Sequence, residues 1–149
     1  MANWQIVPPR SQEEWDKMYQ LRFSVLREPW SEPKGSEKSP DDAISIHAII
    51  LDKENNVIAT CRAHQSGDSQ AQLRFMAVHP DHQGLGLGKA ILKYIEKKAC
   101  DAYNPVHQII LHAREPAVSF YKSNGYEIVS PSYLLFDSIP HFLMVKTMI

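Results

Sequence analysis

The segment of the chain most able to do chemistry is a glycine-rich turn that precedes an amphipathic run. Its residues are Gln83, Gly84, Leu85, Gly86, Leu87, Gly88 and Lys89. Glycines let the backbone approach a ligand closely, and the first turn of a helix presents unpaired N–H groups to an anion. The turn therefore predicts a phosphate-binding site, without identifying the molecule that carries the phosphate.

Two common phosphate-binding motifs do not fit this turn. A P-loop needs a glycine five residues before Gly88 and a serine or threonine after the lysine, whereas the chain has Gln83 and Ala90 there. A dinucleotide fingerprint needs a third glycine three residues after Gly86, where Lys89 stands. A nucleotide-phosphate binder of either kind is therefore disfavoured, and a turn without a ligand is the remaining structural alternative.

The strands that must position this turn are predicted by hydrophobic runs and by turn residues. Strand-like runs occupy residues 3–7, 44–52, 57–64, 70–79, 107–113, 126–129 and 142–146. Turn residues join the second, third and fourth runs at short intervals, which predicts an antiparallel meander. The glycine-rich turn then lies between the last strand of this meander and a helix.

Three helices are predicted between these strands. The first begins at a capping box of Ser11 and Glu14 and stops before Pro29. The second follows the glycine-rich turn, and the third spans 117–124 and leaves through Gly125 in a left-handed conformation. Strands come first and helices are interleaved later, which is the order of a mixed α/β (α+β) fold.

Composition restricts the class of protein further. The chain has 149 residues, enough for one folded domain, which we predict over residues 1–149. Its 44% hydrophobic and 22% charged residues exclude intrinsic disorder, and a net charge of -1 disfavours a nucleic-acid partner.

The chain lacks further signals for membrane, export or metal. Its longest apolar stretch, residues 43–51, is far shorter than the roughly 20 residues of a membrane span, and the first ten residues lack the order of a signal peptide. We therefore expect a cytoplasmic protein without a membrane partner. Cys61 and Cys100 show no metal-ligand spacing, so we expect reduced thiols and no metal.

Three motifs occur in a fixed order across about half of the chain. Residues 73–78, Leu-Arg-Phe-Met-Ala-Val, lead through a His-Pro pair into the turn. The turn supplies Gln-x-x-Gly-x-Gly, and the third motif, Ala-x-x-Phe-Tyr-x-x-x-Gly, consists of Ala117, Phe120, Tyr121 and Gly125. In this order and spacing the chain resembles the GNAT superfamily of acyl-CoA-dependent N-acetyltransferases. Residues 139–144 are also similar to the ElaA-like branch of that superfamily.

This resemblance implies a fold and a co-substrate. The fold is a central, mostly antiparallel mixed sheet of about six to seven strands, flanked by helices. The co-substrate is acetyl-CoA, with the backbone of Met76 and Val78 pairing with the pantetheine arm like an added strand. The amides of the glycine-rich turn, residues 83–89, would surround the pyrophosphate. One position departs from the family, because Arg114 stands where an asparagine is frequent, three residues before the alanine.

Acetyl transfer to an amine requires a neutral amine, a stabilised carbonyl oxygen and a protonated leaving thiol. A backbone amide of Ala77 or Val78 could stabilise the oxygen if the strand separates from its neighbour. The resemblance gives the last role to Tyr121, whose ordinary pKa of about 10 exceeds a thiol's pKa of about 8.5. Candidate general bases are His79, His112, His141 and Glu115, and the residues alone do not decide among them.

The acceptor is expected to be a primary amine of a small molecule or a peptide. Loop residues 28–42, with Trp30, would flank its site. The acidic side chains of this loop, Glu32, Glu37, Asp41 and Asp42, either attract a cationic amine or are simply solvated. Arg22 is either a buried ion-pair partner or a cleft residue. A homodimer is compatible with the fold, and a non-catalytic acyl-CoA-binding sensor or scaffold is the alternative function.

Overall fold

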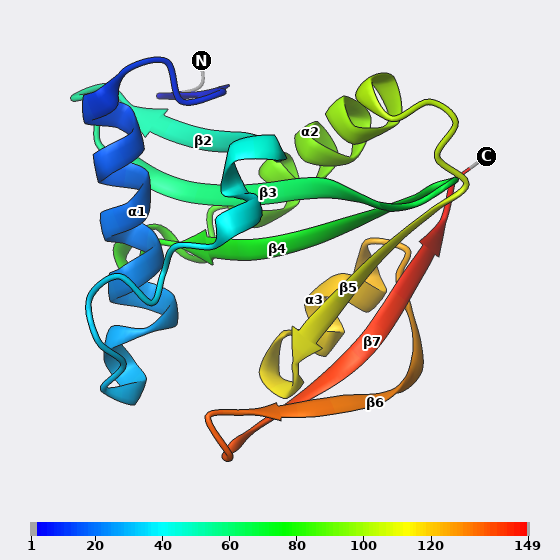
Figure 1. The fold of residues 1–149 in the computed structure, drawn as a ribbon. Helices are drawn as coiled ribbons and strands as arrows, with labels where there is room; N and C mark the ends of the chain where they lie inside the picture. The colour runs from blue at the N-terminus through cyan, green and yellow to red at the C-terminus, as the bar shows by residue number, and fades with distance from the viewer. Residues whose placement is uncertain (1–2, 149) are drawn as a thin grey trace.

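The computed structural model of the chain describes residues 3–148 and is built around one seven-stranded sheet (Figure 1). The strands are β1 (Trp4–Val7), β2 (Ile46–Asp52), β3 (Val57–Gly67), β4 (Gln70–Val78), β5 (Gln108–Arg114), β6 (Glu127–Leu135) and β7 (Ile139–Thr147). The α-helices are α1 (Gln12–Leu26), α2 (Leu87–Ala102) and α3 (Val118–Ser123), and the 3-10 turns are η1 (Glu28–Trp30), η2 (Pro40–Ile44), η3 (Pro80–His82) and η4 (Glu115–Ala117).

The pairing pattern of the sheet changes at one point, between β4 and β5. Its strand order is β1-β2-β3-β4-β5-β7-β6, and every neighbouring pair is antiparallel except β4 and β5, which run parallel. These two strands pair only from Gln70 to Gln72 and from Gln108 to Ile110, within the part of the chain that the structure describes. Beyond these residues they diverge, and the sheet opens into a V (Figure 1). The mixed sheet and its strand number confirm the predicted fold.

Helices cover both faces of the first half of the sheet, which explains why β2 is apolar on consecutive residues. Side chains alternate between the two faces of a strand. Ala48 and Ile50 belong to the core beneath α2, whereas Ile49 and Leu51 pack against α1, and all four are fully buried. The α3 helix lies on the same face as α2 (Figure 1).

The predicted helix signals act largely as expected. The Ser11 hydroxyl accepts a hydrogen bond from the Glu14 N–H at 3.2 Å and begins α1. The Glu14 carboxylate completes no box, because it accepts from the Arg10 N–H instead. Gly125, with φ 94°, ends α3 in the left-handed region, as predicted. No helix within residues 3–148 is long and apolar enough to cross a membrane.

The last two strands are longer than predicted. We expected 126–129 and 142–146, whereas β6 extends to Leu135 and β7 begins at Ile139. Most of β6 is exposed because it is the edge strand, so it lacks the apolar alternation from which strands are recognised. Pro131 also makes β6 hard to recognise in the sequence, because proline usually indicates the end of a strand although it is tolerated in edge strands. The extension adds the β6–β7 hairpin to the wall of the V.

Candidate active site

A cavity of about 610 Å³ occupies the opening between β4 and β5. Its walls are the end of α1, both diverging strands, the glycine-rich turn with the start of α2, α3, and the β6–β7 hairpin. It brings together all the predicted site residues except Leu85: Met76, Ala77, Val78, Gln83, Gly84, Gly86, Leu87, Gly88, Lys89 and Tyr121. The Leu85 side chain is 65% exposed and lies outside it.

Within residues 3–148, the inner edge of β4 beyond Gln72 has no neighbouring strand and faces this cavity. The His79 N–H donates to the Ile58 carbonyl of β3 at 2.9 Å. Because backbone groups alternate between the two sides of a strand, those of Val78 and Met76 point away from β3, toward the opening. By the same alternation the Ala77 amide faces β3. Of the two amides expected to stabilise an oxyanion, only that of Val78 therefore faces the cavity.

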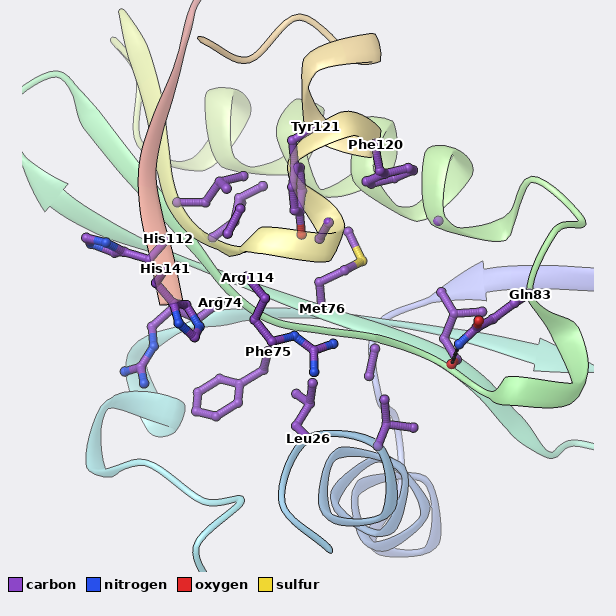
Figure 2. Close-up of a pocket in the computed structure, with 18 of the residues that line it drawn as sticks. Leu26, Arg74, Phe75, Met76, Gln83, His112, Arg114, Phe120, Tyr121 and His141 are labelled. Atoms are coloured by element: carbon purple, nitrogen blue, oxygen red, sulfur yellow. Dashed lines mark hydrogen bonds between the residues drawn. The ribbon is translucent and has the colours of Figure 1, made fainter. Parts of the chain in front are cut away.

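The glycine-rich turn is shaped for close approach at two positions. Gly86, the residue before α2, has φ 82°, a conformation that side chains disfavour, and open space surrounds the position of a Cβ. At Gly88 a Cβ would lie 3.2 Å from the Phe120 ring of α3, so this glycine lets α2 and α3 pack closely. The Gln83 side-chain amide donates to the Val78 carbonyl at 3.2 Å and ties the turn to the end of β4 (Figure 2).

Tyr121 extends from α3 into the middle of the cavity. Its ring packs edge-on against Phe120 and Tyr126 and is 8% exposed. Figure 2 shows the hydroxyl pointing toward Met76, and it has no hydrogen-bond partner within residues 3–148. Burial raises the pKa of this phenol well above its usual range. Tyr121 is therefore a protonated donor without a protein acceptor.

Two of the four candidate bases line the cavity. His112 of β5 and His141 of β7 do so, whereas His79 and Glu115 lie outside it. The His141 Nδ1 lies 3.0 Å from the Ile139 carbonyl oxygen, which can only accept, so Nδ1 carries the proton and Nε2 keeps its lone pair. Burial lowers the pKa of both histidines below the usual value, which keeps His141 neutral and basic at pH 7.

Three arginines line the cavity, and no aspartate or glutamate within residues 3–148 does. Arg27 donates to the carbonyl oxygens of Leu26 and Ser36, both at 3.0 Å. Arg114, at the position that departs from the family motif, lies with its guanidinium carbon 5.3 Å from the Trp30 ring. The guanidinium of Arg74 lies over Phe75. None of the three forms an ion pair within the described residues.

The acidic loop does not face the cavity as an amine-binding surface. Asp42 is buried and binds both Arg22 and Arg62, at 3.0 and 2.9 Å, and Asp41 binds Arg62 at 2.9 Å. Glu37 is also buried, and it accepts from a backbone amide of its own loop. Of the two alternatives weighed, cation attraction is not supported for these residues, because buried arginines pair with Asp41 and Asp42 and Glu37 is held within its own loop. Arg22 is the buried ion-pair partner that we weighed.

One feature of β4 has no counterpart in the sequence patterns. Phe75 has φ 56°, and the β3–β4 register shifts between Thr60 and Arg62, so the strand bulges at the wall of the cavity. The ring stands between the buried ion pairs and the cavity, with the guanidinium carbon of Arg22 at 4.3 Å and that of Arg74 at 4.6 Å. A non-glycine residue in this conformation gives no local signal. Apart from its neighbour Arg74, the cations around the ring, Arg22, Arg27 and Arg62, are distant in sequence.

Comparison with known proteins identifies the family to which the chain belongs. The family model described as acetyltransferase (GNAT) domain matches residues 45–128, more than half of the chain. A relative named as an uncharacterized N-acetyltransferase, YjcF of Bacillus subtilis (strain 168), is 29% identical over 137 residues, covering 92% of this chain and 95% of its own.

Solved structures share the fold over the full length. A protein from Lactobacillus plantarum has a TM-score of 0.84 at 21% identity, covering 99% of this chain and 100% of that chain. Escherichia coli ElaA has a TM-score of 0.76 at 20% identity, covering 98% and 99%. These likenesses confirm the predicted architecture, including its similarity to ElaA.

Proposed function

Because the chain belongs to the GNAT family of acyl-CoA-dependent N-acetyltransferases, we propose that it transfers an acetyl group from acetyl-CoA to a primary amine of a small molecule or peptide. One observation carries this proposal. The unpaired edge of β4, the glycine-rich turn and the Tyr121 hydroxyl all open into the same cavity. A thioester held along β4 would therefore have its phosphates at one end and a proton donor beside its sulfur.

The cofactor is held mainly by backbone groups. The backbone of Met76 and the Val78 N–H pair with the pantetheine arm as an extra strand in the V, where β4 has no neighbouring strand among the described residues. The amides from Gln83 to Lys89 surround the pyrophosphate at the start of α2, where the helix dipole favours negative charge. The exposed Lys89 side chain adds charge at the same end.

The reaction uses two side chains and one backbone amide that line the cavity. The amine nitrogen attacks the thioester carbon while His141 Nε2 takes its proton, directly or through water. The Val78 N–H stabilises the negative oxygen that results. As the carbon–sulfur bond breaks, the thiolate takes the proton of the Tyr121 hydroxyl and leaves as a neutral thiol. The products are the N-acetylated amine and CoA.

Titration calorimetry with acetyl-CoA, with ATP and NAD as controls, tests the first half of this proposal. Selective binding of acetyl-CoA is expected, and a folded protein that does not bind it would refute the proposal. Release of free thiol in the presence of amines tests the second half. Binding without thiol release from any amine would instead support the non-catalytic sensor or scaffold.

A further inference from the structure

We propose that the acceptor amine also carries an anionic oxyacid group, a carboxylate or a phosphate, which Arg74 and Arg114 bind. The inference rests on the proposed acetyl transfer, since it concerns the second substrate of the same cavity. It goes beyond that proposal because it names the chemistry by which the acceptor is recognised.

The charges of the cavity wall carry the inference. Arg27, Arg74 and Arg114 line the wall, and no carboxylate among the described residues does. Arg27 already uses its donors on two backbone carbonyls, whereas the guanidinium groups of Arg74 and Arg114 have no hydrogen-bond partner within residues 3–148. Guanidinium groups bind carboxylates and phosphates through paired donors. Both arginines line the same cavity, so each offers a guanidinium group that is available to an anionic ligand there.

The position of these arginines separates them from the cofactor's phosphates. Arg74 precedes Met76 on β4, and the glycine-rich turn follows the end of that strand. Figure 2 shows Gln83 on one side of Met76, and Arg74, His112 and His141 on the other. Arg114 lies over the ring of Trp30, in the η1 turn that follows α1, and not at the start of α2. The anion site thus lies on the acceptor side of the reaction centre.

The same charges select against cationic acceptors. A polycationic acceptor would be repelled by the arginines, and three acidic residues of loop 28–42 that could offset this repulsion, Glu37, Asp41 and Asp42, are held in internal contacts. An anionic group on the acceptor neutralises the arginines and orients the amine toward the thioester.

The first experiment measures anion binding without turnover. The protein is saturated with CoA, so that the phosphate turn is filled, and is then titrated calorimetrically with inorganic phosphate and with acetate. Saturable binding of at least one of the two is expected for the wild type and for Arg10→Gln, an exposed arginine paired with Glu14 far from the cavity. It should be lost in the double variant Arg74→Gln/Arg114→Gln. Absence of binding, or binding unchanged in the double variant, would overturn the inference.

The second experiment compares matched acceptors at saturating acetyl-CoA. An amino acid is compared with its primary amide, and ethanolamine phosphate with ethanolamine, each corrected for its fraction of neutral amine. The carboxylate or the phosphate member should have a kcat/KM roughly tenfold to a hundredfold higher, and the pair that shows it identifies the anion. This advantage should vanish in the double variant and persist in Arg10→Gln. Equal use of both members would overturn the inference, whereas failure to bind acetyl-CoA would overturn the proposed function instead.

Discussion

Replacing Tyr121 by phenylalanine should slow acetyl transfer while leaving the fold and the affinity for acetyl-CoA intact. The substitution removes one hydroxyl and keeps the ring, which packs against Phe120 and Tyr126. No partner within residues 3–148 loses a hydrogen bond, because the hydroxyl has none there. The free energy of unfolding should therefore change by less than about 0.5 kcal/mol.

The effect on the rate is expected to be far larger. A positioned general acid contributes roughly a hundredfold to ten-thousandfold, which corresponds to about 3–5 kcal/mol in the activation barrier. Burial keeps the Tyr121 hydroxyl protonated by raising its pKa, so the proton is present throughout the neutral pH range. Without it the thiolate must leave unprotonated or take a proton from water.

Steady-state thiol release measures kcat, and calorimetry measures acetyl-CoA affinity in the same preparations. The matched control is Tyr126→Phe, which removes a hydroxyl that donates to the Glu96 carboxylate at 2.7 Å, away from the cavity. This control should lose about 1.5–3 kcal/mol of stability, the value of a hydrogen bond to a charged group, and keep its kcat. A kcat for Tyr121→Phe within about twofold of wild type would refute the assignment of Tyr121 as the acid.

Three further substitutions test other parts of the molecule. Gly86→Val should weaken acetyl-CoA binding by calorimetry, because φ 82° strains a branched residue beside the phosphate path, whereas Gly67→Ala, with an ordinary 3.5 Å contact, should not. The wild-type kcat/KM should fall as pH drops below the ordinary histidine range, because burial lowers the His141 pKa and only the neutral ring accepts a proton. His141→Gln should remove that dependence, and an unchanged profile would exclude it as the base. Arg62→Met should cost about 3 kcal/mol or more in urea unfolding, since Asp42 loses one of its two buried partners; a smaller loss would mean that Arg22 alone suffices.

The elements nearest the cofactor site were predictable from the sequence because their signals are local. Turn residues, apolar runs and glycines predicted the three strands of the meander to within three residues at each end, and they placed the turn and α2 directly after them. The motif of Ala117, Phe120, Tyr121 and Gly125 likewise lies on one short helix, α3, and the residues that flank it. In each case the residues that determine the structure are close neighbours in the chain.

The acceptor side was less predictable because long-range packing builds it. Arg74 and Arg114 stand on different strands, and only the divergence of β4 from β5 lets them line one cavity. From sequence, Asp41 and Asp42 of loop 28–42 either attract a cation or are solvated, whereas the structure pairs them with Arg22 and Arg62. Charge that is neutralised by distant partners leaves no trace in local composition.

The short pairing between β4 and β5 makes the separation of the two strands at the cavity sensitive to the angle between them. The two halves of the sheet are joined over three residue pairs, and Val78 lies six residues beyond Gln72, roughly 20 Å along the strand. At that distance from the paired residues, a change of about 5° in the direction of β4 moves its end by about 2 Å. A 1 Å error between reacting groups can cost roughly a hundredfold in rate. The alignment of thioester and acid therefore depends in part on the residues that pair β4 with β5, such as Gln108, which does not line the cavity.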